Sequence, residues 1–414
     1  MVDIREIFKK FGKYVLAFLK WSALGVIMGV LCGVVGAGFS KSISLVTELR
    51  SQNPWFLFLL LPFGIITVLL YKLCGVSGLG TNQVFDSVRD ENKITFRLAP
   101  AIFISSVLTH LGGGSAGKEG AALQLGGSIT SVVCKIFRLD EKTRHILTMS
   151  GMAALFSAVF GTPLGACVFA LEVVNVGYFC SAALFPTLVA SVAASSLSRT
   201  LGTPVEKLSI GDVPAFSFDT MWRVSVVAVV CAVVSIVFCA ALHILSHYSE
   251  KIFKNPYIRV SVGALVLTAL TALVGSFKYN GGGMEIIVDI FENGRVEHEA
   301  FLLKILFTAI TVAAGYKGGE IVPTMFIGAT LGSLLSLVVG LPVPLCAAVG
   351  LVCMFCAVTN CPLATIFLSI ELFGAEGAVI FAVAIAISFL LSGKFSLYSS
   401  QHFIYSKLDE IKEE

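Results

Sequence analysis

Charged residues are scarce in this chain. Lys, Arg, Asp and Glu make up 13% of its 414 residues, whereas 56% are hydrophobic. A soluble domain usually carries about 25% charged residues, so this deficit is too large for a surface that faces water. Lipid must therefore solvate much of the chain. The formal charge of +3 is small and gives no basic footprint for nucleic acid.

Several motifs are incomplete, and each gap excludes a kind of site. The eleven Cys, an odd number scattered through apolar stretches, do not form a disulfide framework. Cys353 and Cys356 have the CxxC spacing, but no second pair stands nearby, so we expect buried thiols. His243 and His247 lie four residues apart, yet Ile244 stands where a zinc protease has Glu. We expect no metal ion and no cofactor.

Long apolar stretches follow one another from Trp21 to Leu391, separated by polar, Gly-rich or Pro-rich segments. They predict an all-α polytopic membrane protein. About 20 apolar residues are needed to cross the hydrocarbon, and several of these stretches are shorter and broken by Gly or Pro. Helices that stop inside a membrane are tolerated where they line protein or a wet cavity. We therefore expect broken, re-entrant helices.

Two segments of the chain are similar to each other. Residues 151–164 and 350–363 share Gly, Phe, Ala, Val, Pro and Leu at an offset of 199, and Glu172 matches Glu371 at the same offset. Two related halves are typical of transporters, whose substrate site lies where the halves meet near the membrane midplane. We expect inverted repeats, although the sequence does not by itself show their relative orientation.

This repeat divides the chain into parts. The first 20 residues carry Arg5 and four Lys among apolar residues, which predicts an amphipathic basic helix on the cytoplasmic face rather than a cleavable signal peptide. The predicted parts are the basic helix at 1–20, a first membrane repeat at 21–201, a linker at 202–220, a second membrane repeat at 221–392, and a C-terminal pore-contacting and cytoplasmic helix at 393–414.

Residues 112–120, Gly-Gly-Gly-Ser-Ala-Gly-Lys-Glu-Gly, form the most unusual stretch. The spacing approaches a phosphate-binding loop, but Glu119 stands where Ser or Thr would bind magnesium, and no strand is predicted before it. Glycines allow the backbone to approach a ligand, and a helix that begins near Glu119 would point its free N–H groups at a small anion. His110, nearby, either bonds local backbone or takes part in proton movement.

Glu119 can serve an anion and a proton in one place. An ionised carboxylate occupies an anion site itself, and it loses that attraction when it is protonated. The alternative is a helix cap or a pair with Lys118, but an ionisable residue at membrane depth is functional by default. Glu320 ends an equivalent loop, Gly318-Gly319-Glu320, at an offset of 201. Glu172 and Glu371 are either functional or solvated acids at the ends of their apolar stretches.

These segments resemble the CLC family of anion channels and proton-coupled anion antiporters. Gly117-Lys118-Glu119-Gly120 is similar to its Gly-Lys/Arg-Glu-Gly-Pro motif, whose acid is the gating glutamate. Residues 318–323 resemble its Gly-x-Phe-x-Pro segment, and residues 78–82 take the place of its Gly-Ser-Gly-Ile-Pro loop. Residues 396–399 resemble the segment with the pore tyrosine, here Tyr398, for which an interfacial position is the alternative.

The differences from the family pattern indicate a branch. Leu79 replaces the anion-coordinating serine, Thr81-Asn82 replaces Ile-Pro, and Ala121 replaces the last Pro of the gate motif. Glu320 is an acid where chloride-type members have an apolar residue, and Val173 stands in place of their inner proton-relay acid. The pattern resembles the fluoride/proton antiporters of the family. The resemblance implies a multi-pass homodimer in the cell membrane, here the inner membrane, with both termini on the cytoplasmic side.

The resulting hypothesis is proton-coupled fluoride export across a lipid bilayer, with fluoride (alternatively chloride) and protons as the transported ions. Glu119 and Glu320 are the predicted gating and proton-transfer residues. The alternatives are a chloride/proton antiporter, a passive anion channel of this type, and a membrane-embedded hydrolase, for which no nucleophile and base are found at membrane depth. The predicted anion-binding residues are Tyr398, Leu79, Gly80, Gly117, Lys118, Gly120 and Ile321.

Overall fold

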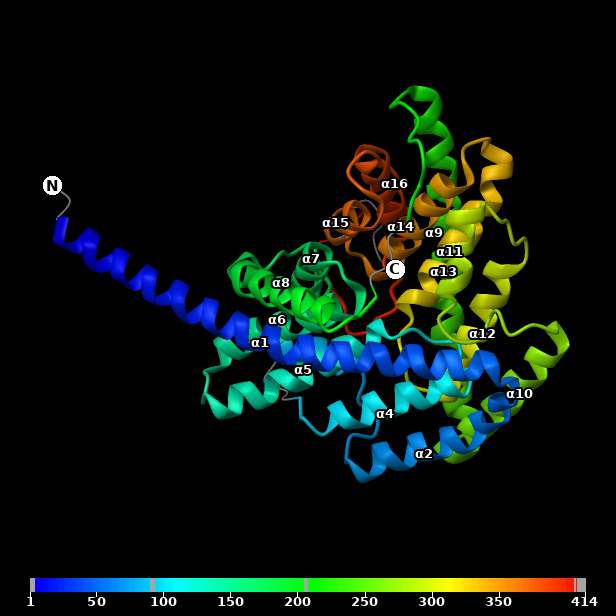
Figure 1. Cartoon of the computed structure of the whole chain (residues 1–414), viewed down its shortest axis with the longest axis horizontal. Coiled ribbons are helices and arrows are strands. Elements are labelled where there is room, and N and C mark those ends of the chain that lie inside the picture. The colour runs from blue at the N-terminus through cyan, green and yellow to red at the C-terminus, as the bar shows by residue number, and fades with distance from the viewer. Residues whose placement is uncertain (1–3, 90–93, 205–207, 406, 408–414) are drawn as a thin grey trace, which may run out of the picture.

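The computed structural model describes residues 4–89, 94–204, 208–405 and 407. Within these residues the chain forms sixteen α-helices, two short 3-10 helices and two short strands (Figure 1). The helices are α1 (Ile4–Gln52), α2 (Leu60–Leu73), α3 (Thr81–Arg89), α4 (Leu98–Leu111), α5 (Glu119–Ile136), α6 (Glu141–Phe160), α7 (Pro163–Glu172), α8 (Leu184–Thr200), α9 (Phe218–Ile252), α10 (Pro256–Val274), α11 (Met284–Asn293), α12 (Ala300–Ala314), α13 (Ile321–Val339), α14 (Val343–Thr359), α15 (Pro362–Phe373) and α16 (Ala378–Leu391). The 3-10 helices are η1 (Pro54–Leu59) and η2 (Ser181–Ala183), and the strands are β1 (Asn175–Val176) and β2 (His402–Phe403).

The helices pack as two groups that meet in the middle of the molecule. In the first group α1 packs on α6 and α8, and α5 packs on α6; in the second, α14 packs on α13 and α9. Six helices of the described chain are long and apolar enough to cross a membrane, and other apolar helices are shorter, with 10–17 residues. The prediction of an all-α polytopic protein with short, broken helices is therefore confirmed.

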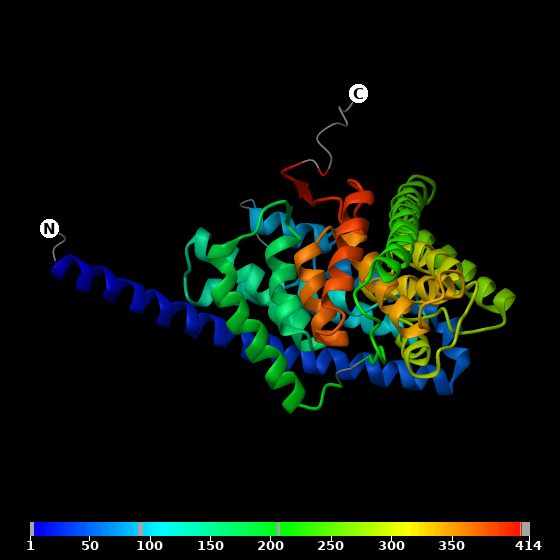
Figure 2. The same ribbon diagram turned by 90° about the horizontal axis from the view of Figure 1, so that it is seen from above.

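The first helix is continuous through the predicted boundary at residue 20. Its N-terminal end projects beyond the rest of the molecule in both views (Figures 1 and 2). No Gly or Pro interrupts the sequence around Lys20 and Trp21, so the backbone has no reason to break there. Residues 1–3 and the side chains of residues 4–9 lie outside the described part, so the amphipathic face predicted there stays a prediction.

The two similar segments fold in the same way. Gly161 follows α6 and Asn360 follows α14, each with a left-handed backbone (φ 80° and 58°), which is a common way for a helix to end. Pro163 and Pro362 then occupy the first turns of α7 and α15, where the missing N–H costs nothing. The local sequence therefore breaks the chain at repeat-related points.

Glycines also bring helices into contact at matching places. A methyl group on Gly126 would lie 2.1 Å from the Gly151 carbonyl oxygen, and one on Gly328 would lie 2.3 Å from that of Gly350. Both distances are below van der Waals contact, so α5 crosses α6, and α13 crosses α14, at a separation that only Gly permits. Small residues of this kind allow close helix packing inside a membrane.

The C-terminal segment returns to the middle of the molecule without forming a helix. The Leu397 N–H donates to the Val358 carbonyl at 2.9 Å, and strand β2 pairs in parallel with strand β1 of the first group. Residues 393–405 and 407 thus do not form the helix predicted there, because their backbone bonds to other parts of the fold. Residues 406 and 408–414 lie outside the described part.

Candidate functional site

The two acidic glycine loops meet backbone to backbone. The Gly117 N–H donates to the Gly319 carbonyl at 2.6 Å, and the Gly319 N–H donates to the Gly117 carbonyl at 2.7 Å. Helix α5 begins two residues after this bridge at Glu119, and α13 begins at Ile321, with Glu320 as its N-cap. The positive ends of two helix dipoles therefore point toward one place from the two halves.

This meeting requires glycine. A methyl group on Gly319 would lie 2.4 Å from the Gly120 nitrogen, and one on Gly120 would lie 2.8 Å from the Gly319 Cα. The Glu320 Oε2 atom would lie 3.5 Å from that second methyl group. The predicted residues Gly117, Gly120, Glu119, Glu320 and Ile321 therefore lie together.

Glu119 lines a cavity. Its side chain is fully buried, and a methyl group on Gly117 would lie 2.6 Å from its Oε2 atom, so the carboxylate turns back over the glycine loop. The cavity has a volume of about 640 Å³ and is lined by residues of both halves, among them Arg50, His110, Lys118, Lys278 and Glu285. It exceeds the size of a halide, so it can deliver a hydrated anion to Glu119.

Cationic groups border this cavity. The Lys118 Nζ donates to Ser40 Oγ of α1 at 3.0 Å, and Arg50 Nη1 donates to the His110 carbonyl at 2.5 Å. Lys278 pairs with Glu297 at 2.7 Å. An anion that enters the cavity thus meets two cations, Lys118 and Arg50, whose side chains donate to neutral oxygens.

Tyr398 is not part of the cavity lining. The ring is almost completely buried, and its hydroxyl has no hydrogen-bond partner within the described chain. Both Glu119 and Glu320 are within electrostatic range of that hydroxyl. A buried hydroxyl without a protein partner is a donor left available for a ligand. The interfacial alternative for this tyrosine is excluded by its burial.

The loop before α3 contributes differently. Leu79 packs against an apolar cluster around Tyr71 and Val76. The Gly80 N–H donates to Gln83 Oε1 at 2.7 Å, so this donor is already used inside the first turn of α3. Neither residue presents a free donor to an anion in this structure, and their anion-binding roles stay predictions.

Glu172 and Glu371 form a reciprocal pair. The Glu172 carboxylate accepts the N–H groups of Leu363 and Ala364 at 3.2 and 2.8 Å, at the start of α15. The Glu371 carboxylate accepts those of Leu164 and Gly165 at 2.9 and 2.8 Å, at the start of α7. Glu172 is the last residue of α7, Glu371 lies in the last turn of α15, and each acid caps the helix of the other half. Glu172 is therefore a buried cap and not a solvated acid, whereas Glu371 is a cap that stays partly exposed.

The other candidates have local partners. His110 Nδ1 lies 2.8 Å from the Ser106 carbonyl, which is the predicted backbone contact. His243 Nε2 lies 2.8 Å from the Ser396 carbonyl. Cys353 and Cys356 are buried thiols. In the described part of the chain no group of three or more His, Cys, Asp or Glu side chains could hold a metal ion.

Sequence reasoning missed Lys304. This residue is fully buried in α12, where its Nζ donates to the carbonyls of Gly281 and Tyr279 at 2.6 and 3.2 Å and lies 5.0 Å from the centre of the Phe326 ring. A lone lysine in an otherwise apolar stretch was the available signal. It fixes residues 279–283, whose Gly281 N–H in turn donates to the Gly114 carbonyl of the first glycine loop at 3.0 Å.

Comparison with known proteins agrees with this geometry. Residues 63–393 match the family described as "Voltage gated chloride channel". The chain belongs to this family. Its members are channels and transporters, so this chain is a membrane transport protein of the CLC type and not an enzyme.

Three known proteins illustrate the similarity. A chloride/fluoride channel protein of Pseudomonas syringae pv. tomato is 34% identical over 94% of this chain and 87% of its own length. The crystal structure of a CLC-type fluoride/proton antiporter has a TM-score of 0.88, with 33% identity over 93% of this chain and 98% of that chain. A slow cyanobacterial Cl-/H+ antiporter shares the fold, with a TM-score of 0.76 at 20% identity over 90% of this chain and 94% of its own.

Proposed function

We propose that this protein exchanges fluoride for protons and thereby exports fluoride, with Glu119 as gate and proton carrier. The observation that carries this proposal is the meeting of the α5 and α13 N-termini, which brings Glu119 and Glu320 to one place. The buried Tyr398 hydroxyl lies within electrostatic range of both acids. A place with backbone N–H groups, a hydroxyl donor and a carboxylate suits both a small anion and a proton.

Glu119 couples the two ions by competition. As a carboxylate it occupies the anion position between the cavity and Tyr398. When a proton arrives from the cavity, the neutral acid loses its attraction to the helix N-termini and yields the position to fluoride. The same proton then leaves on the opposite side of the membrane, and the ionised carboxylate returns to the anion position. Glu320, at the start of the opposing helix, is a second acid along this path.

Two differences from the chloride-type sequence pattern favour fluoride over chloride. Leu79 offers no hydroxyl, and Val173 offers no inner acid, at the positions where chloride antiporters have them by the resemblance. Fluoride is small and strongly hydrated, and it accepts hydrogen bonds better than chloride does, so a protonated carboxyl or a phenol donor suits it. The solved structure of a fluoride/proton antiporter supports the same choice, and the relative named a chloride/fluoride channel protein is compatible with either halide.

Flux across reconstituted vesicles tests this proposal. The vesicles start with equal pH on both sides, and a potassium ionophore clamps the membrane voltage. An imposed fluoride gradient should then drive protons in the direction opposite to the fluoride flux. An equal chloride gradient should drive protons at least about tenfold more slowly. Proton movement that is equal with the two halides would contradict the fluoride assignment.

A passive anion channel is the second candidate, because the Pseudomonas relative is named a channel. The same vesicles distinguish the two. A channel lets fluoride pass without moving protons, whereas an antiporter moves protons against their own gradient. Fluoride flux with no proton countermovement would establish the channel.

The Tyr398 hydroxyl is proposed as a fluoride donor. Replacing it by Tyr398→Phe keeps the ring and removes only the O–H group. The KM for fluoride should rise by about tenfold, because the variant loses one hydrogen bond to a charged ligand. Tyr405→Phe is the matched control, because Tyr405 is 70% exposed. An unchanged KM in the Tyr398→Phe variant would remove this donor from the account.

We also propose that two copies assemble in the inner membrane of the cell. Exposed apolar side chains lie on α7, α8, α15 and α16, including Leu164, Leu184, Leu363, Phe367 and Val379. These surfaces suit lipid or a second copy. The mass of the detergent-solubilised protein by light scattering should be that of two chains, and a single-chain mass would contradict the dimer.

A further inference from the structure

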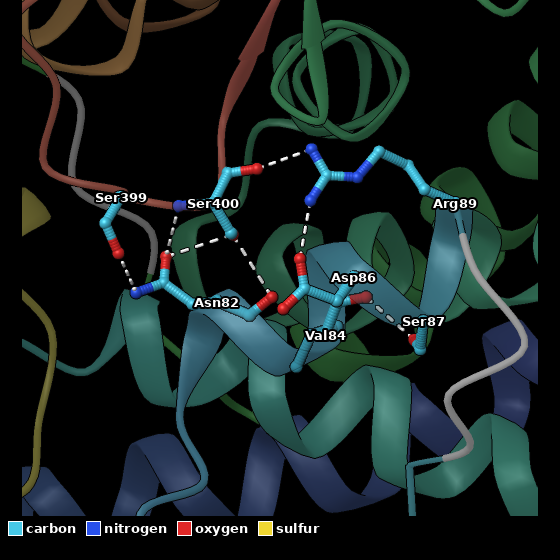
Figure 3. Close-up of polar contacts among 7 residues, drawn as sticks. All are labelled: Asn82, Val84, Asp86, Ser87, Arg89, Ser399 and Ser400. Carbon is cyan, nitrogen blue, oxygen red and sulfur yellow. Dashed lines mark hydrogen bonds and ion pairs between the residues drawn. The ribbon is translucent and has the colours of Figure 1, made fainter.

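Helix α3 holds the segment that carries Tyr398. Asn82, in its first turn, donates from Nδ2 to Ser399 Oγ at 2.9 Å (Figure 3). The Asn82 Oδ1 atom accepts the Ser400 N–H at 3.3 Å and the Ser400 hydroxyl at 3.1 Å. One asparagine side chain therefore binds the two residues that directly follow the tyrosine.

The far end of α3 binds the same segment. Arg89 Nη1 donates to the Ser400 carbonyl at 2.5 Å, and its Nη2 pairs with Asp86 at 2.5 Å, which fixes the guanidinium (Figure 3). The N–H, carbonyl and hydroxyl of Ser400 all have partners on α3. These contacts of Asn82 and Arg89 with residues 399–400 are called the α3 clamp below.

The clamp acts on Tyr398 at short range. Ser400 is two residues from Tyr398, and the Phe85 ring of the same helix meets the Tyr398 ring edge-on, with the centroids 4.9 Å apart. The Tyr398 hydroxyl has no hydrogen-bond partner of its own in the described chain. The position of this hydroxyl is therefore set by its backbone and by the ring packing, and α3 supplies contacts to both.

Helix α3 is also tied to the helix that begins at Glu119. Gln124 Nε2 of α5 donates to Thr81 Oγ1, the residue before Asn82, at 3.1 Å. A continuous set of contacts thus runs from α5 through Thr81 and Asn82 to the tyrosine segment. Asn82 is suited to this place because its amide has both a donor and an acceptor.

We propose that Asn82 is a positioning residue: through the α3 clamp it holds the Tyr398 hydroxyl at a fixed distance from Glu119 and so sets the affinity for the transported anion. The role in anion affinity rests on the proposed function, whereas the positioning of Tyr398 does not. Asn82 itself touches no transported ion in this account.

The test combines a spectroscopic signal with transport. A single 3-fluorotyrosine at position 398 reports the ring environment by fluorine NMR in the full-length protein without any ion gradient. In Asn82→Ala the resonance should shift or split, and the KM for fluoride should rise about fivefold while the maximal rate stays within about twofold. Asn82→Asp should restore both, because its carboxylate still accepts from the Ser400 N–H and hydroxyl, and the Ser399 hydroxyl can turn to donate to the oxygen that replaces Nδ2.

Asn293→Ala is the matched control, an exposed helical asparagine whose side chain bonds only locally to Asp289. In this variant the fluorine resonance at position 398 and the KM for fluoride should equal those of the unchanged protein. An unmoved Tyr398 signal in Asn82→Ala would overturn the proposal, and so would an Asn82→Asp variant as perturbed as the Asn82→Ala variant. If Asn82→Ala does not fold, Ser400→Ala is measured in the same way.

The two proposals fail separately. If the unchanged protein does not exchange fluoride for protons, the proposed function fails, yet the NMR comparison still decides whether Asn82 positions Tyr398. If exchange is present and the signal is unmoved in the variants, only the role of Asn82 fails.

Discussion

Two pairs of repeat-related acids occupy contrasting environments in this protein. Glu172 and Glu371 each accept two backbone N–H groups at the start of a helix in the opposite half. Glu119 and Glu320 instead stand at the starts of their own helices, where the two halves touch through Gly117 and Gly319. The first pair joins the halves, and the second pair lies where we propose that the ligand path passes between them.

The contrast shows that depth in the membrane does not by itself assign a role to an acid. A carboxylate at the positive end of a helix is stabilised by the dipole in both pairs, and Glu172 and Glu371 also accept backbone N–H groups. The difference lies in access, since Glu119 lines an open cavity and Glu172 does not. The following predictions test this division, from the largest effect to the smallest.

Breaking the meeting of the glycine loops should have the largest effect. In Gly319→Ala the added methyl group would lie 2.4 Å from the Gly120 nitrogen, so the N-termini of α5 and α13 must separate. The transport rate should fall on the order of 100-fold, because a displacement of about 1 Å at a reacting site can slow a reaction by about that factor. Initial fluoride efflux from vesicles measures this. Gly38→Ala is the control, because a methyl group there has no neighbour within 4 Å.

Removing the charge of a joining acid should cost stability and leave coupling intact. Glu172→Gln replaces a charged acceptor of two N–H groups by a neutral one, and the free energy of unfolding should fall by about 1–3 kcal/mol. Glu371→Gln should behave alike, since its contacts are equivalent. Thermal unfolding in detergent measures the change, with exposed Glu376→Gln as control. An unchanged melting temperature in both variants would show that the capping contacts contribute nothing.

The smallest effect is expected at Asp140, an exposed N-cap at the start of α6. Its hydrogen bonds with the Thr143 hydroxyl and N–H hold the pKa of the carboxyl below its ordinary value. This contribution to stability is therefore complete above the unfolded-state pKa and is lost as the pH falls through the lowered folded-state pKa. Asp140→Ala should lower the melting temperature slightly at pH 7, and the difference should shrink below about pH 4. A difference that is constant with pH would contradict this reason.

Much of the candidate site could be predicted from the sequence because the repeat marks it. Two glycine loops that end in Glu119 and Glu320 can meet only if the halves face each other, and the backbone bridge between Gly117 and Gly319 confirms that they do. The sequence also predicted helices broken at Gly or Pro, and Gly161 and Pro163 stand at one such break. These features depend on residues that are close in sequence.

The rest depends on partners that are distant in sequence. The N–H groups that bind Glu172 lie 191 and 192 residues away, so no local pattern could distinguish a cap from a solvated acid. The contacts between Asn82 and residues 399–400 have the same character. The helix predicted at 393–414 is absent from the described part of that segment, because its backbone bonds to Val358 and to strand β1, which are distant in sequence.

The most direct measurement compares proton coupling in Glu119→Gln and Glu172→Gln. Both changes remove one carboxylate from a buried helix terminus, so the two variants are matched in the charge that they lose. In vesicles with an imposed fluoride gradient, we predict no proton countermovement in Glu119→Gln. The proton-to-fluoride ratio of Glu172→Gln should equal that of the unchanged protein. Intact coupling in Glu119→Gln, or coupling lost only in Glu172→Gln, would contradict the assignment of Glu119 as gate and proton carrier.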